Sequence, residues 1–146
     1  GGTQAGMHLG IMLSGLSCRI VPVSIDKDET GGHSIEDIVQ ALVTEGIQAL
    51  GLSKSFNPQD AKLLHDYDAA GYGVLTEPER QAIQLVARTE GILVDPVYTG
   101  RAFYGMVDQL QKNPMYAGKT ILFWHTGGFP AIFQEQYAQA LGRALA

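Results

Sequence analysis

One stretch, Asp95–Ala102 (DPVYTGRA), constrains the fold of this chain more than any other. It follows the apolar run of residues 92–94 and leads into a helical pattern that continues to about Lys112. An apolar run, a proline and then Tyr-Thr-Gly at the head of a helix is typical of a loop that delivers side chains to a cleft. The plainer explanation is a strand-to-helix loop in which Thr99 is only the N-cap. On this stretch alone the plainer explanation is favoured.

The order of patterns along the chain predicts a layered α/β fold. Apolar runs typical of strands occupy Arg19–Ile25, Ala61–Tyr67 and Lys119–His125, with a short extended piece at Ile47–Phe56. Helical patterns follow Gly1–Gly6 as far as Leu16, then run from Ser34 to near Gly46, from Thr76 to Gly91, from Gly100 to Lys112 and from Ala131 to Leu145. Strands that alternate with helices favour a largely parallel sheet flanked by helices. At 146 residues the chain has the size of one domain.

Composition excludes several classes of partner. The net charge is −5 and no stripe of Lys or Arg is present, so we expect no nucleic-acid partner. No apolar run reaches the roughly 18–20 residues that a bilayer requires, so we expect no membrane span. The single cysteine, Cys18, precludes an internal disulfide and suits a reducing, cytoplasmic compartment. Because the chain opens on a glycine turn without a methionine, we expect the parent protein to continue upstream.

Three turns could hold a ligand. Gly1–Gly6 (GGTQAG) places small residues and a hydroxyl directly before an apolar helix, where free N–H groups and the helix dipole attract a phosphate. Thr126–Gly128 likewise places a hydroxyl and a tight glycine turn at the carboxyl end of an expected strand, where ligands bind in open α/β sheets. Tyr72 stands between two glycines, which leaves its ring free to face a ligand. For Gly1–Gly6 the signal is weak, since glycines also serve as plain turns. For Thr126–Gly128 a plain strand-to-helix turn is favoured, and for Tyr72 a plain turn is about as well supported as a ligand site.

Other candidates for chemistry are weak. His8, His33 and His65 do not have the spacing of metal ligands, and we expect no metal site. No serine lies in the context of a nucleophile elbow, so a hydrolase triad does not emerge.

Taken together, the turns occur in the order and spacing of one known family. The segments are GGTQAG at Gly1–Gly6, AGYG at Ala70–Gly73, EGILVDPVYTGRA at Glu90–Ala102 and ILFWHTGG at Ile121–Gly128. The chain resembles the carboxyl-terminal half of a D-cysteine desulfhydrase, within the pyridoxal-phosphate-dependent family that also contains 1-aminocyclopropane-1-carboxylate deaminase. The resemblance covers essentially residues 1–146. It implies the tryptophan synthase β-like fold (fold type II). This chain would be the carboxyl-terminal portion of the large, cofactor-binding domain of such an enzyme.

The resemblance assigns roles to particular residues. It implies that Gly1, Gly2 and Thr3 hold the phosphate of pyridoxal 5'-phosphate through backbone and hydroxyl donors. Tyr98 and Tyr72 would line the substrate side of the pyridine ring as catalytic residues.

The resemblance also places Thr99 and Thr126 near the pyridine nitrogen. In the deaminase branch the residue that matches Thr99 is a glutamate and the residue that matches Thr126 is a leucine. A carboxylate there keeps the ring nitrogen protonated and deepens the electron sink, whereas a neutral hydroxyl does so less. Elimination of a thiolate needs only modest carbanion stabilisation, and opening a cyclopropane needs more. Both positions therefore favour the desulfhydrase branch.

The implied activity is a lyase reaction that eliminates sulfide from D-cysteine, or a related β-substituted amino acid, to give pyruvate and ammonia. Deamination of 1-aminocyclopropane-1-carboxylate and L-cysteate sulfo-lyase activity remain alternatives within the family. A non-catalytic α/β module that binds a phosphorylated small molecule is an alternative from another class, and a fragment that does not fold unaided is a third. The expected partners are a small amino-acid substrate and, in the parent enzyme, a second copy in a homodimer.

Some positions depart from the family pattern. His65 and Ala70 stand where more acidic or glycine-like residues are usual, and Arg101 replaces the commoner lysine without expected harm. The family's Schiff-base lysine belongs to the amino-terminal half, and the chain is therefore expected to be inactive by itself. The lysines that match no such motif are Lys27, Lys54, Lys62, Lys112 and Lys119.

Overall fold

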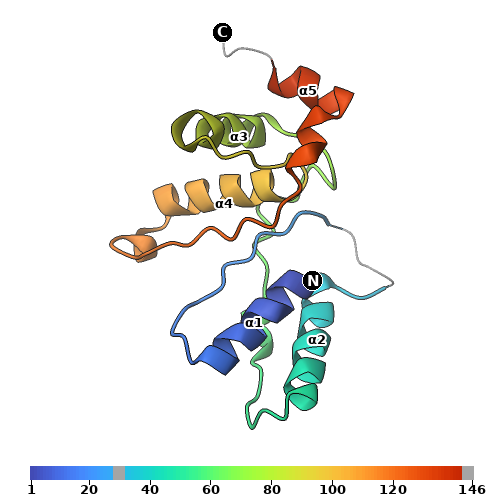
Figure 1. Ribbon diagram of the computed structural model, residues 1–146, viewed down its shortest axis with the longest axis vertical. Coiled ribbons are helices and arrows are strands. Elements are labelled where there is room, and N and C mark those ends of the chain that lie inside the picture. The colour runs from blue at the N-terminus through green and yellow to red at the C-terminus, as the bar shows by residue number, and fades with distance from the viewer. Residues whose placement is uncertain (28–31, 143–146) are drawn as a thin grey trace. The chain divides into compact units, whose positions relative to one another are not determined.

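The computed structural model describes residues 1–27 and 32–142. The chain forms two compact units (Figure 1). The first comprises Gly1–Pro22 and residues 32–64, and the second comprises Val23–Lys27 and residues 65–142.

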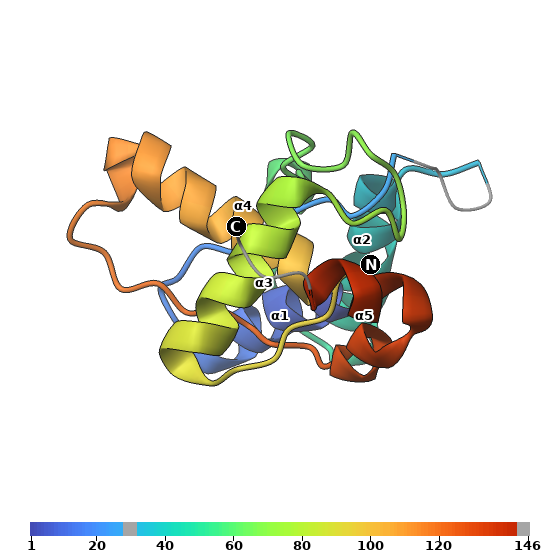
Figure 2. The same cartoon turned by 90° about the horizontal axis from the view of Figure 1, so that it is seen from above.

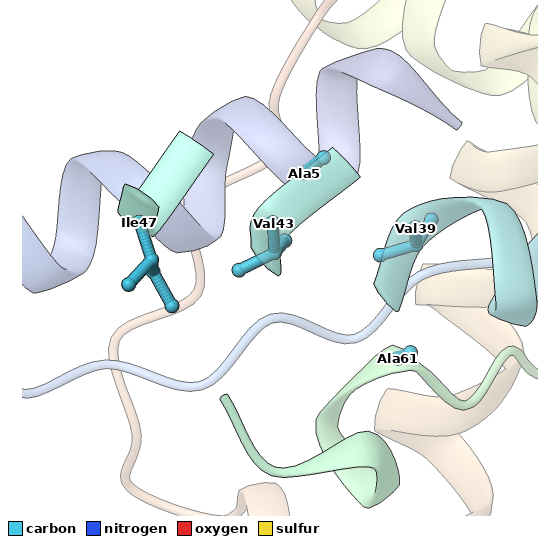
Figure 3. Packing of buried hydrophobic residues seen from close by; sticks show 5 residues of the cluster. All are labelled: Ala5, Val39, Val43, Ile47 and Ala61. Atoms are coloured by element: carbon cyan, nitrogen blue, oxygen red, sulfur yellow. The ribbon is translucent and has the colours of Figure 1, made fainter. Parts of the chain in front are cut away.

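The first unit packs two helices, α1 (Gly2–Ser14) and α2 (Ile35–Ala49), with a short 3-10 turn, η1 (Pro58–Ala61). Its core consists of buried side chains from all three elements (Figure 3), namely Ala5, Val39, Val43, Ile47 and Ala61. The N-cap predicted for the second helix is confirmed, because the hydroxyl of Ser34 accepts a hydrogen bond from Asp37 N–H at 3.1 Å. The helix continues past Gly46 to Ala49. A Cβ on Gly46 would overlap the side chain of Leu9, so this glycine allows α1 and α2 to approach closely rather than ending α2.

Helix α1 differs from the expectation in its start and its burial. It begins at Gly2, inside the predicted glycine turn, and ends at Gly15, which adopts the left-handed conformation with φ 68°. Only one face is buried, since Leu13 is 58% exposed. The apolar composition of this helix predicts burial on most faces, and that prediction is wrong within this unit.

The second unit contains α3 (Glu77–Glu90), α4 (Thr99–Lys112) and α5 (Glu135–Leu141), with 3-10 turns η2 (Pro114–Tyr116) and η3 (Phe129–Phe133). Helix α3 packs on α4, and α5 also contacts α3 (Figure 1 and Figure 2). Ile83, Val86 and Val94 form the buried core. The helix expected over residues 131–145 is instead the turn η3 followed by the short α5, and residues 143–146 lie outside the described part.

The predicted strands do not form in the parts that the structure describes. Residues 19–25, 62–67 and 119–125 form no extended strand, and the only β pairing within these ranges is at the isolated bridge residues Val23 and Leu64. Residues 47–49 of the expected extended piece belong to α2. The aliphatic and aromatic run of Lys119–His125 predicts a buried strand, yet Leu122 is 78% and Trp124 56% exposed. A strand requires a partner for its backbone hydrogen bonds, and an apolar run cannot by itself supply one.

No helix in the described ranges is long and apolar enough to cross a membrane.

Candidate active site

Asp95 organises the DPVYTG loop in the second unit. Its side chain is buried, and its carboxylate accepts hydrogen bonds from the backbone N–H groups of Val97, Tyr98 and Thr99, each at 2.7 Å. These N–H groups lie at the start of α4 and have no partner within the helix. Asp95 therefore caps α4, and the prediction that Thr99 is the N-cap is wrong, because Thr99 is the first helical residue. The signal in the sequence was an Asp-Pro pair just ahead of the helix.

The hydroxyl of Thr99 is held by the same carboxylate. It donates to Asp95 Oδ1 at 2.6 Å and accepts from the backbone N–H of Asp95 at 2.8 Å. A threonine hydroxyl has one proton and two lone pairs, so one lone pair is left. Gly100 is required behind it, since a Cβ there would stand 2.5 Å from the carbonyl oxygen of Asp95. The loop thus fixes a neutral, buried oxygen at position 99.

The Thr126–Gly128 turn lies against this loop. His125 Nε2 is 2.9 Å from the carbonyl oxygen of Leu93, and the N–H of Gly127 donates to His125 Nδ1 at 2.9 Å. Because Nδ1 accepts, the imidazole proton is on Nε2 and donates to Leu93. A Cβ on Gly128 would meet Asp95 Cγ at 2.9 Å, which shows how closely the turn approaches the cap. His125 and Gly128, which flank the exposed Thr126, therefore lie against Leu93 and Asp95, a few residues before Thr99.

The two predicted tyrosines meet in the second unit. Their hydroxyl oxygens are 2.5 Å apart, and their ring centroids are 5.7 Å apart at an interplanar angle of 75°. Tyr72 is 53% and Tyr98 45% exposed, so the pair faces outward. The hydrogen bond to Tyr72, followed by burial, raises the pKa of Tyr98 above its ordinary value. Tyr98 is consequently a neutral phenol at physiological pH.

The turn that carries Tyr72 has glycines on both sides for a conformational reason. Gly71 and Gly73 have φ of 86° and 72°, a region that side chains other than glycine rarely adopt. The carbonyl oxygen of Gly73 accepts a hydrogen bond from Tyr137 OH at 2.6 Å, and that of Gly71 accepts from Arg101 at 3.0 Å.

Arg101 is a buried residue whose importance the sequence did not reveal. Its side chain is fully buried and forms an ion pair with Glu79, with Arg101 Nε 2.5 Å from Glu79 Oε1. The guanidinium also donates to the carbonyl oxygens of Ile25, Gly71 and Val74. The expectation that arginine replaces lysine here without harm stays a prediction, and the structure adds that Arg101 makes four buried polar contacts.

Gly1, Gly2 and Thr3 lie at the exposed N-terminus of α1 in the first unit. The first backbone bond of the helix runs from Ala5 N–H to Gly1 at 3.1 Å, so the N–H groups of Gly2, Thr3 and Gln4 have no partner within the helix. A Cβ on Gly1 or Gly2 would meet nothing within 4 Å, and no side chain caps the helix. Open space, unshared N–H groups and the positive end of the helix dipole fit a phosphate.

Other kinds of site do not emerge among the residues described. No group of three His, Cys, Asp or Glu residues is arranged to hold a metal ion there. An open surface hollow at the start of α5 is lined by polar side chains and includes none of the predicted site residues.

Residues 1–127 match the family of pyridoxal-phosphate dependent enzymes. This chain belongs to that family. The family match confirms pyridoxal phosphate as the expected cofactor, and the N-terminus of α1 has the donors that its phosphate requires.

The relatives agree with the resemblance. A D-cysteine desulfhydrase of Yersinia enterocolitica is 39% identical over 133 residues, which are 90% of this chain and 38% of that protein. The mitochondrial bifunctional D-cysteine desulfhydrase/1-aminocyclopropane-1-carboxylate deaminase of Arabidopsis thaliana is 33% identical over 145 residues, which are 97% of this chain and 34% of that protein. The chain thus spans well under half the length of these relatives.

A solved structure of a homologue of 1-aminocyclopropane-1-carboxylate deaminase matches with a TM-score of 0.79 and 36% identity. The match covers 96% of this chain and 40% of that one. It supports the fold type II assignment, while the layered sheet of that assignment is not formed among residues 1–27 and 32–142.

Proposed function

We propose that the whole protein is a pyridoxal-phosphate-dependent carbon–sulfur lyase that releases sulfide, pyruvate and ammonia from D-cysteine or a close relative. The observation that carries the proposal is the hydroxyl at position 99. It is neutral, buried and already donates its proton to Asp95. A residue in this state adds no negative charge beside a ring nitrogen.

The bound cofactor supplies an electron sink for a carbanion at the substrate's α-carbon. The residues of this chain do the holding. In the first unit, Gly1, Gly2 and Thr3 would hold the cofactor's phosphate at the N-terminus of α1. In the second unit, Thr99 and Thr126 would present neutral groups to its ring. With neutral side chains at positions 99 and 126 the sink would be shallower, which suffices to expel a thiolate but disfavours ring opening.

The Tyr72–Tyr98 pair supplies a hydroxyl proton that can bond to the substrate. In the contact between Tyr72 and Tyr98 one hydroxyl donates to the other, so the proton of the second hydroxyl stays free to bond a substrate. Because the pKa of Tyr98 is raised, its hydroxyl stays protonated at neutral pH and can donate a hydrogen bond, for instance to the departing sulfur.

The test uses the full-length protein loaded with pyridoxal phosphate. We expect pyruvate and sulfide from D-cysteine, and little ammonia from 1-aminocyclopropane-1-carboxylate. The double variant Thr99→Glu/Thr126→Leu is expected to lose D-cysteine turnover and gain deamination, whereas Thr89→Glu on the exposed side of α3 changes neither. Turnover of the cyclopropane acid with none of D-cysteine would overturn the assignment.

Deamination of 1-aminocyclopropane-1-carboxylate is the second candidate, because the Arabidopsis relative is named for both activities. Steady-state rates on the two substrates in one preparation separate the candidates. A non-catalytic phosphate-binding module is distinguished by titrating the 146-residue chain with pyridoxal phosphate and with nucleotides. L-cysteate sulfo-lyase activity, the homodimer and the cytoplasmic location stay predictions.

A further inference from the structure

Burial of the Arg101 side chain removes a charged guanidinium from water. A guanidinium cannot lose its charge, and its burial is tolerated only when it is paired and hydrogen-bonded. Arg101 meets both conditions, with the Glu79 carboxylate at 2.5 Å and the carbonyl oxygens of Ile25 at 2.5 Å, Val74 at 2.9 Å and Gly71 at 3.0 Å. The four acceptors come from three separate segments of the second unit. A residue that merely packed would not need this arrangement.

Two of these acceptors stand on either side of Tyr72. Gly71 precedes the tyrosine and Val74 follows it, and both carbonyl oxygens point to the same guanidinium. At its other end Arg101 belongs to the first turn of α4, three residues after Tyr98. The guanidinium therefore joins the backbone around Tyr72 to the helix that begins beside Tyr98.

We propose that Arg101 is a positioning residue that fixes the Gly71–Val74 turn to α4 and so sets the contact between the Tyr72 and Tyr98 hydroxyls. The proposal rests on the proposed function for its catalytic consequence, but the contact itself exists with or without a substrate.

Lysine, the commoner residue at this position in the family, would satisfy only part of the arrangement that Arg101 makes in this chain. Arginine presents five N–H donors in a planar fork, whereas lysine presents three from a single nitrogen. Arg101→Lys would keep the charge opposite Glu79 but could not reach Gly71, Val74 and Ile25 together. The turn would then move relative to Tyr98 while the phosphate site on α1 stayed intact.

The first measurement follows the ionisation of Tyr98 in the full-length protein by nuclear magnetic resonance of ring-labelled tyrosine, with Tyr98→Phe identifying the signal. The pKa of Tyr98 is raised mainly by its bond to Tyr72, so Tyr72→Phe should lower it toward the ordinary tyrosine value. Arg101→Lys should lower it in the same direction, and combining the two substitutions should add nothing. Arg88→Lys, on an exposed arginine near the end of α3, should leave it unchanged.

The second measurement is kinetic. We expect Arg101→Lys to reduce kcat for D-cysteine about ten- to a hundred-fold with KM little changed, since misplacement of a catalytic group by about 1 Å costs up to roughly a hundred-fold. Cofactor absorbance should be retained. If D-cysteine proves not to be a substrate, the proposed function fails, and the Tyr98 titration still tests the positioning role.

A second variant covers the case in which Arg101→Lys does not fold. Gly71→Ala strains a glycine at φ 86° that supplies one of the acceptors, and Gly91→Ala imposes similar strain at φ 67° at the end of α3. Neither added Cβ meets an atom within 4 Å. Gly71→Ala should lower the pKa of Tyr98, and Gly91→Ala should not. An unchanged Tyr98 titration in Arg101→Lys, or in Gly71→Ala if only that variant folds, overturns the proposal.

Discussion

At the scale of single residues, Asp95 does most to shape the candidate site. One carboxylate caps α4, holds the Thr99 hydroxyl and abuts Gly128. The loop that was first attributed to Thr99 is in fact built around this aspartate. The structural cap is Asp95, and Thr99, for which the resemblance implies a role at the cofactor, is in contact with it.

Asp95→Asn should destabilise the chain. The amide keeps one acceptor oxygen but turns an NH2 group toward backbone N–H donors, which leaves buried donors without partners. We expect the free energy of unfolding to fall by about 2–3 kcal/mol. Urea denaturation followed by circular dichroism measures it, with Asp66→Asn at an exposed position as the control. Equal stability of the two variants would contradict the capping role.

The glycines of the Thr126–Gly128 turn offer a matched comparison. Gly127 and Gly128 both have positive φ, at 93° and 85°, so alanine strains the backbone similarly at each. Only at Gly128 would the added Cβ collide with Asp95. We expect Gly128→Ala to cost about 1–3 kcal/mol more than Gly127→Ala in urea denaturation. Equal urea midpoints for the two variants would mean that Gly128 is not packed against Asp95.

At the scale of elements, the capping residue Glu79 of α3 has a second role in the ion pair with Arg101. Its predicted start at Thr76 is confirmed, since Glu79 Oε2 accepts the N–H of Thr76 at 2.8 Å. The other oxygen of Glu79 pairs with Arg101. The same carboxylate thus begins one helix and neutralises the buried charge of the next.

Glu79→Gln should therefore be far more costly than Glu77→Gln, although both remove an acidic group from the first turn of α3. Loss of one partner of a buried ion pair costs about 3–5 kcal/mol. Glu77 is exposed, and its pKa is lowered to about 2 by hydrogen bonds from Arg80 and Gln81. The stability that the ionised Glu77 carboxylate contributes is fully present above the ordinary pKa of a glutamate, and it is lost as the pH falls toward 2. Chemical denaturation at neutral and acidic pH measures both effects; equal losses at neutral pH would rule out this role for Glu79.

At the scale of the whole molecule, the two hydrophobic cores share no residue. The first unit buries side chains of α1, α2 and η1, and the second buries side chains of α3 together with Val94. Stability should then be local to each unit.

Val43→Ala in the first core and Val86→Ala in the second test this independence. Each removes buried methyl groups from a side chain that is at most 3% exposed, at an expected cost of about 1.5–3 kcal/mol. Hydrogen exchange read by mass spectrometry should accelerate in α2 for the first variant and in α3 for the second. Acceleration of both helices by either substitution would indicate a single cooperative unit.

The sequence by itself determined what depends on neighbours within a few positions. Ser34 and Thr76 mark two helix starts and Gly91 a helix end, because caps bond to backbone groups within three or four residues. The four motifs likewise identified the family.

Only the tertiary structure decided what depends on distant partners. The apolar run at residues 119–125 looked like a strand, but strand formation requires a paired neighbour, which is lacking in the described parts. Arg101 looked interchangeable with lysine because its partners lie 22 to 76 residues away along the chain. A window of sequence contains a residue's own chemistry but not the acceptors that folding places around it.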